Sequence, residues 1–177
     1  MTEKSKADLV IRRAVAQDIW PAAKVHELAF PRQTFSHDWL DCVFRSFPKS
    51  QLFVAERAGE IVGLIFWTEK SGFRKEAVVE LEQIAVHPNK QSIGIGTQLI
   101  MQSLPLVAEK IAERGAKLGH VLINTRVDNY SQELYRKTLG ARPAAVVSGL
   151  FTADEVFMVA HNIDLAKLQT KNMQKSK

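Results

Sequence analysis

A strand pattern that runs directly into a glycine-rich turn is the feature of this sequence that most constrains its fold. Residues 78–86 are β-branched or alternate apolar with polar, which is typical of a strand, and Pro88 and Asn89 end it. Gly94 and Gly96 follow, and an apolar helical pattern begins after them. A helix start carries about four N–H groups without internal acceptors, and glycines let an anion come close to them. The segment therefore predicts a phosphate-binding turn.

Two common glycine-rich motifs do not fit this turn. A P-loop requires a Lys-Ser or Lys-Thr pair directly after its glycines, and none follows here. The dinucleotide fingerprint requires a third glycine at a position that Leu99 occupies, and it usually lies at the first strand of a domain. A dinucleotide-binding protein is therefore a weaker alternative.

The other patterns predict one domain that mixes β-hairpins with a single β-α-β crossover. A chain of 177 residues has the length of one domain with a substantial core. Further strands are predicted at 9–13, 51–56, 60–68, 120–125, 143–148 and 155–160, and further helices at 16–29, 36–47, 106–114 and 131–139. This order indicates an α/β fold with a mixed sheet.

Two helix details follow from single residues. Ser36 is expected to be the N-cap of the second helix. Pro105 lies inside the helical pattern that follows the glycines, and an internal proline costs about 3 kcal/mol because it lacks an N–H group. We therefore expect a kink or a restart at Pro105.

Composition and charge exclude several classes of protein. No apolar run reaches the roughly 20 residues of a membrane span and the first residues lack a signal core, so we expect a cytoplasmic protein without a membrane partner. The net charge of +5 includes +3 in residues 164–177, which leaves +2 for the rest and argues against a nucleic-acid partner. We expect flexible residues 1–7, one domain at 8–163 and a disordered basic tail at 164–177.

Metal and thiol chemistry are also not expected. The single cysteine, Cys42, lies in an amphipathic helical pattern and cannot form an internal disulfide. No His or Cys cluster has the spacing of metal ligands, so we expect no metal, and each histidine is expected to be structural or exposed.

The pattern Gln91-x-x-Gly94-x-Gly96, directly after a strand that ends at residues 84–88, resembles the acetyl-CoA signature of the GNAT acetyltransferase superfamily. The order of predicted elements is similar to that family over about residues 8–162. The resemblance implies a GNAT-like mixed, mostly antiparallel sheet, flanked by helices, whose central strands splay apart to leave a cleft for the pantetheine arm. It also implies acetyl-CoA as co-substrate.

The resemblance further implies which residues bind the coenzyme. The backbone at the end of the strand would pair with the pantetheine amides as an extra strand would, and the pyrophosphate would lie on the N–H groups that follow. The implied coenzyme-binding residues are Ile84, Ala85, Val86, Gln91, Ser92, Ile93, Gly94, Ile95, Gly96, Thr97, Asp128 and Asn129.

Two glutamates are candidates for the base that acetyl transfer to an amine requires. An amine with a pKa near 10.4 is almost wholly protonated at pH 7, and removing its proton costs roughly 4.6 kcal/mol. Glu80 and Glu82 lie two residues apart in a strand, so both are expected on one face, opposite Val79 and Leu81. The resemblance to histone-type members places Glu80 at the base position, while Glu82 lies nearer the thioester. Both stay candidates, and the alternative is two ordinary solvent-facing carboxylates, because a bulge near Ile84 would redirect either side chain.

Tyr135 is the candidate acid that protonates the leaving thiolate, a role that the resemblance implies. The family pattern Asn-x-x-Ala/Ser-x-x-Leu/Phe-Tyr is met only if Asp128 replaces the asparagine, and the spacing from Tyr135 to Gly140 is one residue longer than usual. The usual spacing would instead place Arg136 at the tyrosine position and Asn129 at the asparagine position. A core tyrosine is the alternative.

The sequence thus predicts an acetyl-CoA-dependent N-acetyltransferase that transfers an acetyl group directly to a primary amine, without an acyl-enzyme intermediate. The acceptor is a small-molecule amine or a protein or peptide amine, and a homodimer is one option for its assembly. The irregularities at Asp128 and Gly140 motivate the alternative of a non-catalytic acyl-CoA-binding sensor or adaptor module.

Overall fold

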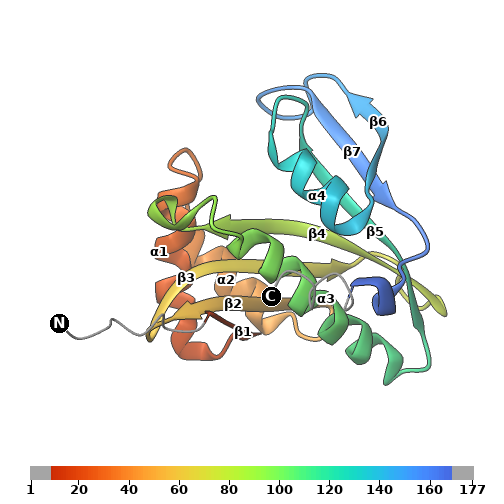
Figure 1. Ribbon diagram of the computed structural model, residues 1–177, viewed down its shortest axis with the longest axis horizontal. Helices are drawn as coiled ribbons and strands as arrows, with labels where there is room; N and C mark the ends of the chain where they lie inside the picture. The colour runs from red at the N-terminus through yellow and green to blue at the C-terminus, as the bar shows by residue number, and fades with distance from the viewer. Residues whose placement is uncertain (1–8, 169–177) are drawn as a thin grey trace.

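The computed structural model describes residues 9–168 and shows a seven-stranded sheet with helices on both faces (Figure 1). The strands are β1 (Leu9–Arg13), β2 (Ser50–Arg57), β3 (Glu60–Glu69), β4 (Glu76–Val86), β5 (Lys117–Arg126), β6 (Arg142–Val147) and β7 (Glu155–Ala160). The helices are α1 (Ile19–Ala29), α2 (Ser36–Arg45), α3 (Ile95–Ala112) and α4 (Ser131–Leu139), with 3-10 turns η1 (Ala16–Asp18) and η2 (Pro88–Lys90). The predicted elements are therefore all present, with ends that differ by a few residues.

The sheet confirms the predicted mixed, mostly antiparallel topology. Its strand order is β1-β2-β3-β4-β5-β7-β6, and β4 and β5 form the parallel pair while the other neighbours are antiparallel. Pairing between β4 and β5 runs from Glu76 opposite Lys117 to Leu81 opposite Ile123. Within residues 9–168, residues 82–86 of β4 have no strand partner on the β5 side. The two central strands diverge there, as predicted (Figure 1).

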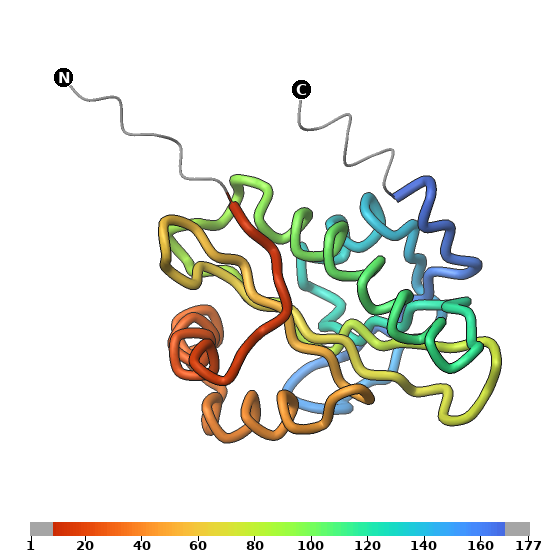
Figure 2. Tube along the Cα trace, turned by 90° about the horizontal axis from the view of Figure 1, so that it is seen from below, coloured from red at the N-terminus to blue at the C-terminus, as the bar shows by residue number. Residues whose placement is uncertain are grey.

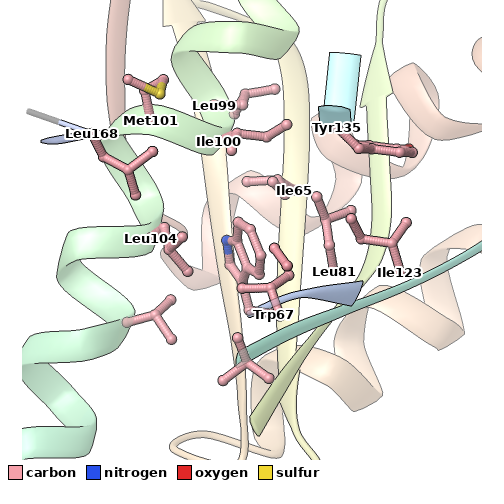
Figure 3. Close-up of a cluster of buried hydrophobic side chains, with 14 of the residues drawn as sticks. Ile65, Trp67, Leu81, Leu99, Ile100, Met101, Leu104, Ile123, Tyr135 and Leu168 are labelled. Atoms are coloured by element: carbon pink, nitrogen blue, oxygen red, sulfur yellow. The ribbon is translucent and has the colours of Figure 1, made fainter. Parts of the chain in front are cut away.

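Two apolar clusters hold the helices onto opposite faces of the sheet. Figure 2 shows α1 and α2 on one side of the strands and α3 on the other. The larger cluster lies on the α3 side and includes Trp67, Leu81 and Ile123 (Figure 3). The smaller cluster packs α1 and α2 against residues of β2, β3 and β4. Strands β2 and β3 are buried on both faces, which explains their nearly continuous apolar sequence.

The structure departs from two local expectations about helices. Helix α3 runs from Ile95 to Ala112 through Pro105, so no restart occurs there, and a kink at Pro105 stays a prediction. Leu104 and Val107 beside the proline are buried, and their packing offsets the hydrogen bond that Pro105 cannot donate. Ser36 is the first residue of α2 rather than its N-cap, because its hydroxyl bonds to the His26 ring instead of to the helix backbone.

The expected flexible residues 1–7, and residues 169–177 of the expected basic tail, lie outside the described residues. The start of that tail is described: residues 165–168 are helical, and Leu168 is buried in the α3-side cluster. No helix among residues 9–168 is long and apolar enough to cross a membrane.

Candidate active site

The turn between β4 and α3 is anchored to the end of β4 by its own side chains. The His87 ring accepts a hydrogen bond at Nδ1 from the Asn89 backbone N–H, with a distance of 3.2 Å. Gln91 donates from Nε2 to the carbonyl oxygen of Val86, at 3.1 Å. Gln91 thus shapes the turn from inside, and a direct contact with a coenzyme stays a prediction.

Beyond Gln91 the turn presents a row of backbone amides without internal acceptors. Ser92 and Gly94 adopt positive φ angles of 63° and 89°, and Gly94 is the N-cap of α3. In the part of the chain that the structure describes, none of the N–H groups of residues 92–97 donates a hydrogen bond to another residue. Six free donors at the positive end of an 18-residue helix favour an anion.

Gly96 allows the first turn of α3 to lie close to two other elements. A Cβ atom at this position would be 3.3 Å from Leu134 Cδ2 of α4 and 3.9 Å from Ile84 Cδ1 of β4. The missing side chain therefore brings the amide row next to the point where β4 leaves β5.

A β-bulge at Glu82 lies at this same point. Trp67 of β3 pairs with Leu81, and Phe66 pairs with Gln83, so Glu82 has no partner in the register. Glu80 and Glu82 were expected on one face because strand residues alternate strictly between the two faces. The bulge interrupts that alternation at Glu82.

The bulge also reverses the facing of the residues that follow it. Ile84 and Val86 pack against the α3-side cluster, whereas Ala85 belongs to the α1-side cluster. Because β5 has already diverged, the backbone of residues 82–86 offers an open edge that an extended chain can join as a further strand.

The two candidate bases differ in their partners. Glu80 forms an ion pair with Lys70, at 3.0 Å between Oε2 and Nζ, and its side chain is 20% exposed. The hydrogen bond with Glu80 raises the pKa of Lys70, and the field of Glu82 adds to this effect. Within residues 9–168 the Glu82 carboxylate has no hydrogen-bond or ion-pair partner. Glu82 is therefore the less neutralised of the two.

Tyr135 is buried beside the diverging strands. It belongs to the α3-side cluster with Leu81 and Ile123, and Figure 3 shows its ring near both. Burial raises the pKa of Tyr135 to about 12, with a smaller contribution from Tyr130. Its hydroxyl makes no hydrogen bond within the described part of the chain.

Arg136, the competing residue at the tyrosine position, points away from the core. Its guanidinium is exposed and pairs with Glu133 at 2.6 Å. Helix α4 therefore turns Tyr135, and not Arg136, toward the buried cluster that contains Leu81 and Ile123, the last pair between β4 and β5.

Asp128 and Asn129 form the turn between β5 and α4. The Asn129 side chain accepts a hydrogen bond from the Ser131 N–H at 2.9 Å and donates one to Thr125 Oγ1 at 2.7 Å. Asp128 pairs with Arg126 at 2.7 Å. These contacts hold the start of α4 in place, and a role for either residue in coenzyme binding stays a prediction.

The residues predicted for the site did not include three polar residues on the face opposite α3. They are Lys70, which binds Glu80, and His26 and Gln83, which bind each other. A usable signal existed for His26, because it follows Ala22 and Ala23 at helical spacing on the buried side of α1.

Two surface cavities of about 610 and 630 Å³ lie elsewhere. The first is lined by residues of β1, η1, α1 and the β2–β3 turn and by His87, and the second by Glu76, the end of α3, the start of β5 and residues 162–165. Neither is lined by Glu80, Glu82, Tyr135 or residues 91–97. The candidate site is thus the open edge of the sheet rather than an enclosed cavity.

Comparisons with known proteins agree with this geometry. The fold is similar to ribosomal-protein-S18-alanine N-acetyltransferase from Escherichia coli, with 17% identity, 89% of this chain and 96% of that one covered, and a TM-score of 0.67. It is similar to an aminoglycoside 6'-N-acetyltransferase solved in complex with coenzyme A, with 16% identity, 88% and 98% covered, and a TM-score of 0.70. A GNAT acetyltransferase from Elizabethkingia anophelis with acetyl-CoA bound gives 19% identity, 89% and 99% covered, and a TM-score of 0.64.

The comparison with curated protein sequences finds no match. The model of the acetyltransferase (GNAT) family matches residues 15–141, which span β4, the amide row, β5 and α4. The match covers more than two thirds of the chain, so this protein belongs to the GNAT acetyltransferase family.

Proposed function

We propose that this protein is an N-acetyltransferase that uses acetyl-CoA as co-substrate and transfers the acetyl group directly to a primary amine. The observation that carries the proposal is the row of amides at residues 92–97, which have no acceptor among the described residues, beside the edge of β4 that no described strand covers. Solved relatives of the same fold hold coenzyme A or acetyl-CoA, which supports the choice of ligand.

The amide row and the open strand edge suit two different parts of the coenzyme. The N–H groups of residues 92–97 would hold the pyrophosphate, and the backbone of residues 84–86 would pair with the pantetheine amides. An arm laid along this edge, from the amide row toward the point of divergence, ends beside the bulge at Glu82. The thioester would therefore lie between Glu82 and Tyr135.

Glu82 is the residue that we assign as the base. Glu80 already shares its carboxylate with the Lys70 ammonium, whereas the Glu82 carboxylate has no partner among residues 9–168. Glu82 would take the amine proton, directly or through a water molecule, and so help to meet the roughly 4.6 kcal/mol cost of deprotonating the acceptor at pH 7. Glu80 would hold Lys70 beside the same site.

Tyr135 would donate a hydrogen bond to the sulfur as negative charge develops on it. Its ring is fixed by the core around Leu81 and Ile123, so the hydroxyl is pre-oriented. Transfer needs no covalent intermediate on the protein, and Cys42 lies on the exposed part of α2. A cytoplasmic location and a homodimer stay predictions from the sequence.

A non-catalytic acyl-CoA-binding module is the second candidate. The observation that favours it is the pKa of Tyr135, which at about 12 makes this residue a weak proton donor. The acceptor of a catalytic form is a small-molecule amine or a protein amine, since relatives of this fold act on an aminoglycoside and on a ribosomal protein.

Calorimetry with acetyl-CoA and a thiol-release assay separate the two candidates. The assay uses kanamycin, spermidine, lysine and a peptide with an N-terminal alanine. We expect binding, release with at least one amine, and a much larger loss for Glu82→Gln than for Glu80→Gln. Glu76→Gln, at the exposed start of β4, is the matched control.

Binding of acetyl-CoA without release from any amine would favour the module. Absence of binding would overturn both candidates. Equal losses for Glu80→Gln and Glu82→Gln would overturn the assignment of the base.

A further inference from the structure

A chain of hydrogen bonds crosses from α1 to the strand that carries the proposed base. The His26 side chain on α1 is almost fully buried, and its Nδ1 lies 2.9 Å from Ser36 Oγ at the start of α2. Its Nε2 lies 2.8 Å from Gln83 Nε2 of β4. The same Gln83 nitrogen donates to Gln33 Oε1, at 3.3 Å, in the loop between the two helices. Four side chains are thus linked, one each from α1, α2, β4 and the loop between the two helices.

The arrangement requires a neutral imidazole. Gln83 donates its two N–H groups to His26 and Gln33, so Nε2 of His26 is the acceptor and Nδ1 carries the proton that is donated to Ser36. Burial lowers the pKa of His26, while Glu27 on the same helix and Gln33 act in the opposite direction. The contacts from α2, β4 and the loop come from uncharged residues.

The position of Gln83 gives this network a link to the site. Gln83 directly follows the bulged Glu82 and directly precedes Ile84, the first residue of the proposed pantetheine-binding edge. The loop of residues 30–35 lies with α1 and α2 on the face opposite α3, whereas the amide row belongs to the start of α3 (Figure 2). An acceptor that approaches from the face free of the coenzyme meets this loop.

We propose that His26 and Gln83 are positioning residues that tie the loop of residues 30–35 to β4 beside Glu82, and so set the affinity for the acceptor. The inference rests on the proposed acetyl transfer. Neither side chain touches the reacting atoms. Their effect is to fix the distance between the acceptor-side loop and the base, and a displacement of about 1 Å at such a site is worth up to about 100-fold in rate.

The first test measures the network without any reaction. Gln83→Ala and His26→Asn should increase hydrogen exchange in residues 30–36, while His161→Asn, at the histidine that directly follows β7, should not. By NMR, His26 of the wild type should titrate below 6.5. In Gln83→Glu it should titrate higher than in the wild type, because a carboxylate beside the ring favours the charged form.

The second test measures the kinetic consequence. For whichever of kanamycin, spermidine and the alanine-terminated peptide the wild type acetylates, Gln83→Ala should lower kcat/KM for the acceptor by about 10- to 100-fold, with a higher acceptor KM. The dissociation constant of acetyl-CoA should stay within about twofold, because the amide row is untouched. Gln83→Asn, which keeps the amide, should recover part of the lost affinity.

The outcomes separate the two levels of inference. Unchanged exchange in residues 30–36 overturns the positioning role whatever the activity. Faster exchange with an unchanged acceptor KM also overturns it. A wild type that binds acetyl-CoA but acetylates none of the amines overturns the proposed catalysis. In that case the hydrogen-exchange and NMR results alone decide whether His26 and Gln83 hold the loop of residues 30–35 to β4.

Discussion

Replacing Tyr135 by Phe removes one hydroxyl from the proposed site and tests its role as hydrogen-bond donor to the leaving sulfur. The pKa of Tyr135 is about 12 because the ring is buried, whereas a thiol has a pKa of about 8.5. Complete proton transfer from Tyr135 to the thiolate is therefore uphill by about 3.5 units, or about 4.8 kcal/mol. Tyr135 can instead donate a hydrogen bond to the developing thiolate. This lowers the barrier by less than a full proton transfer would, but it does not carry that free-energy cost.

The expected size of the effect follows from that distinction. A hydrogen bond to a charged group is worth about 1.5 to 3 kcal/mol, so Tyr135→Phe should lower kcat by about 10- to 150-fold. The melting temperature should change little, because the hydroxyl makes no hydrogen bond within residues 9–168. The dissociation constant of acetyl-CoA should also be retained.

Thiol release at saturating acetyl-CoA is the assay, and Tyr130→Phe, at an exposed tyrosine five positions earlier, is the matched control. The pH profile supplies a second readout, since a pKa of about 12 keeps Tyr135 protonated throughout the usable range. A loss smaller than about twofold in kcat would refute the role, because it lies well below the range expected for such a bond. So would an alkaline limb near pH 9 that disappears in Tyr135→Phe.

Three further predictions concern stability and coenzyme binding. Ser103→Ala leaves the buried Trp67 indole N–H, now 2.8 Å from Ser103 Oγ, without an acceptor, and denaturant titration should show a loss of about 1 to 3 kcal/mol. Gly96→Val places methyl groups against Leu134, whose Cδ2 lies 3.3 Å from the position of a Cβ, so calorimetry should show acetyl-CoA binding weakened by about tenfold or more. Burial lowers the pKa of His26 in the folded state, so the unfolded chain takes up this proton first as the pH falls below about 6.5. The free energy of unfolding should therefore decrease in that range, and the decrease should be smaller in His26→Asn.

The parts of the fold that depend on local pattern were predictable from the sequence. The strand, glycine turn and helix around Gly94 and Gly96 follow from residue types that act on their own backbone, and α4 has the predicted bounds of Ser131 and Leu139. The open edge of β4 was predicted through the family resemblance, and the register confirms it.

The parts that depend on an extra residue or on a distant partner were not predictable. Nothing in the sequence marks Glu82 as bulged, because a glutamate suits either face of a half-exposed strand. Lys70 reaches Glu80 across a hairpin, and Gln83 reaches His26 across 57 positions, so neither contact has a local signature. The competition between Tyr135 and Arg136 was a question of helix rotation, which packing decides.

The parallel seam between β4 and β5 has a consequence for the acyl group. Six residues of β4 pair with β5 before the two strands diverge, and the last pair, Leu81 with Ile123, marks where the opening begins. A longer or bulkier acyl group needs a wider opening between β4 and β5, and widening it requires the loss of main-chain hydrogen bonds between the two strands. The acyl length that the site accepts then depends on how many residues of β4 and β5 pair. Engineering that preference means shifting the point at which the two strands diverge, rather than shortening a side chain.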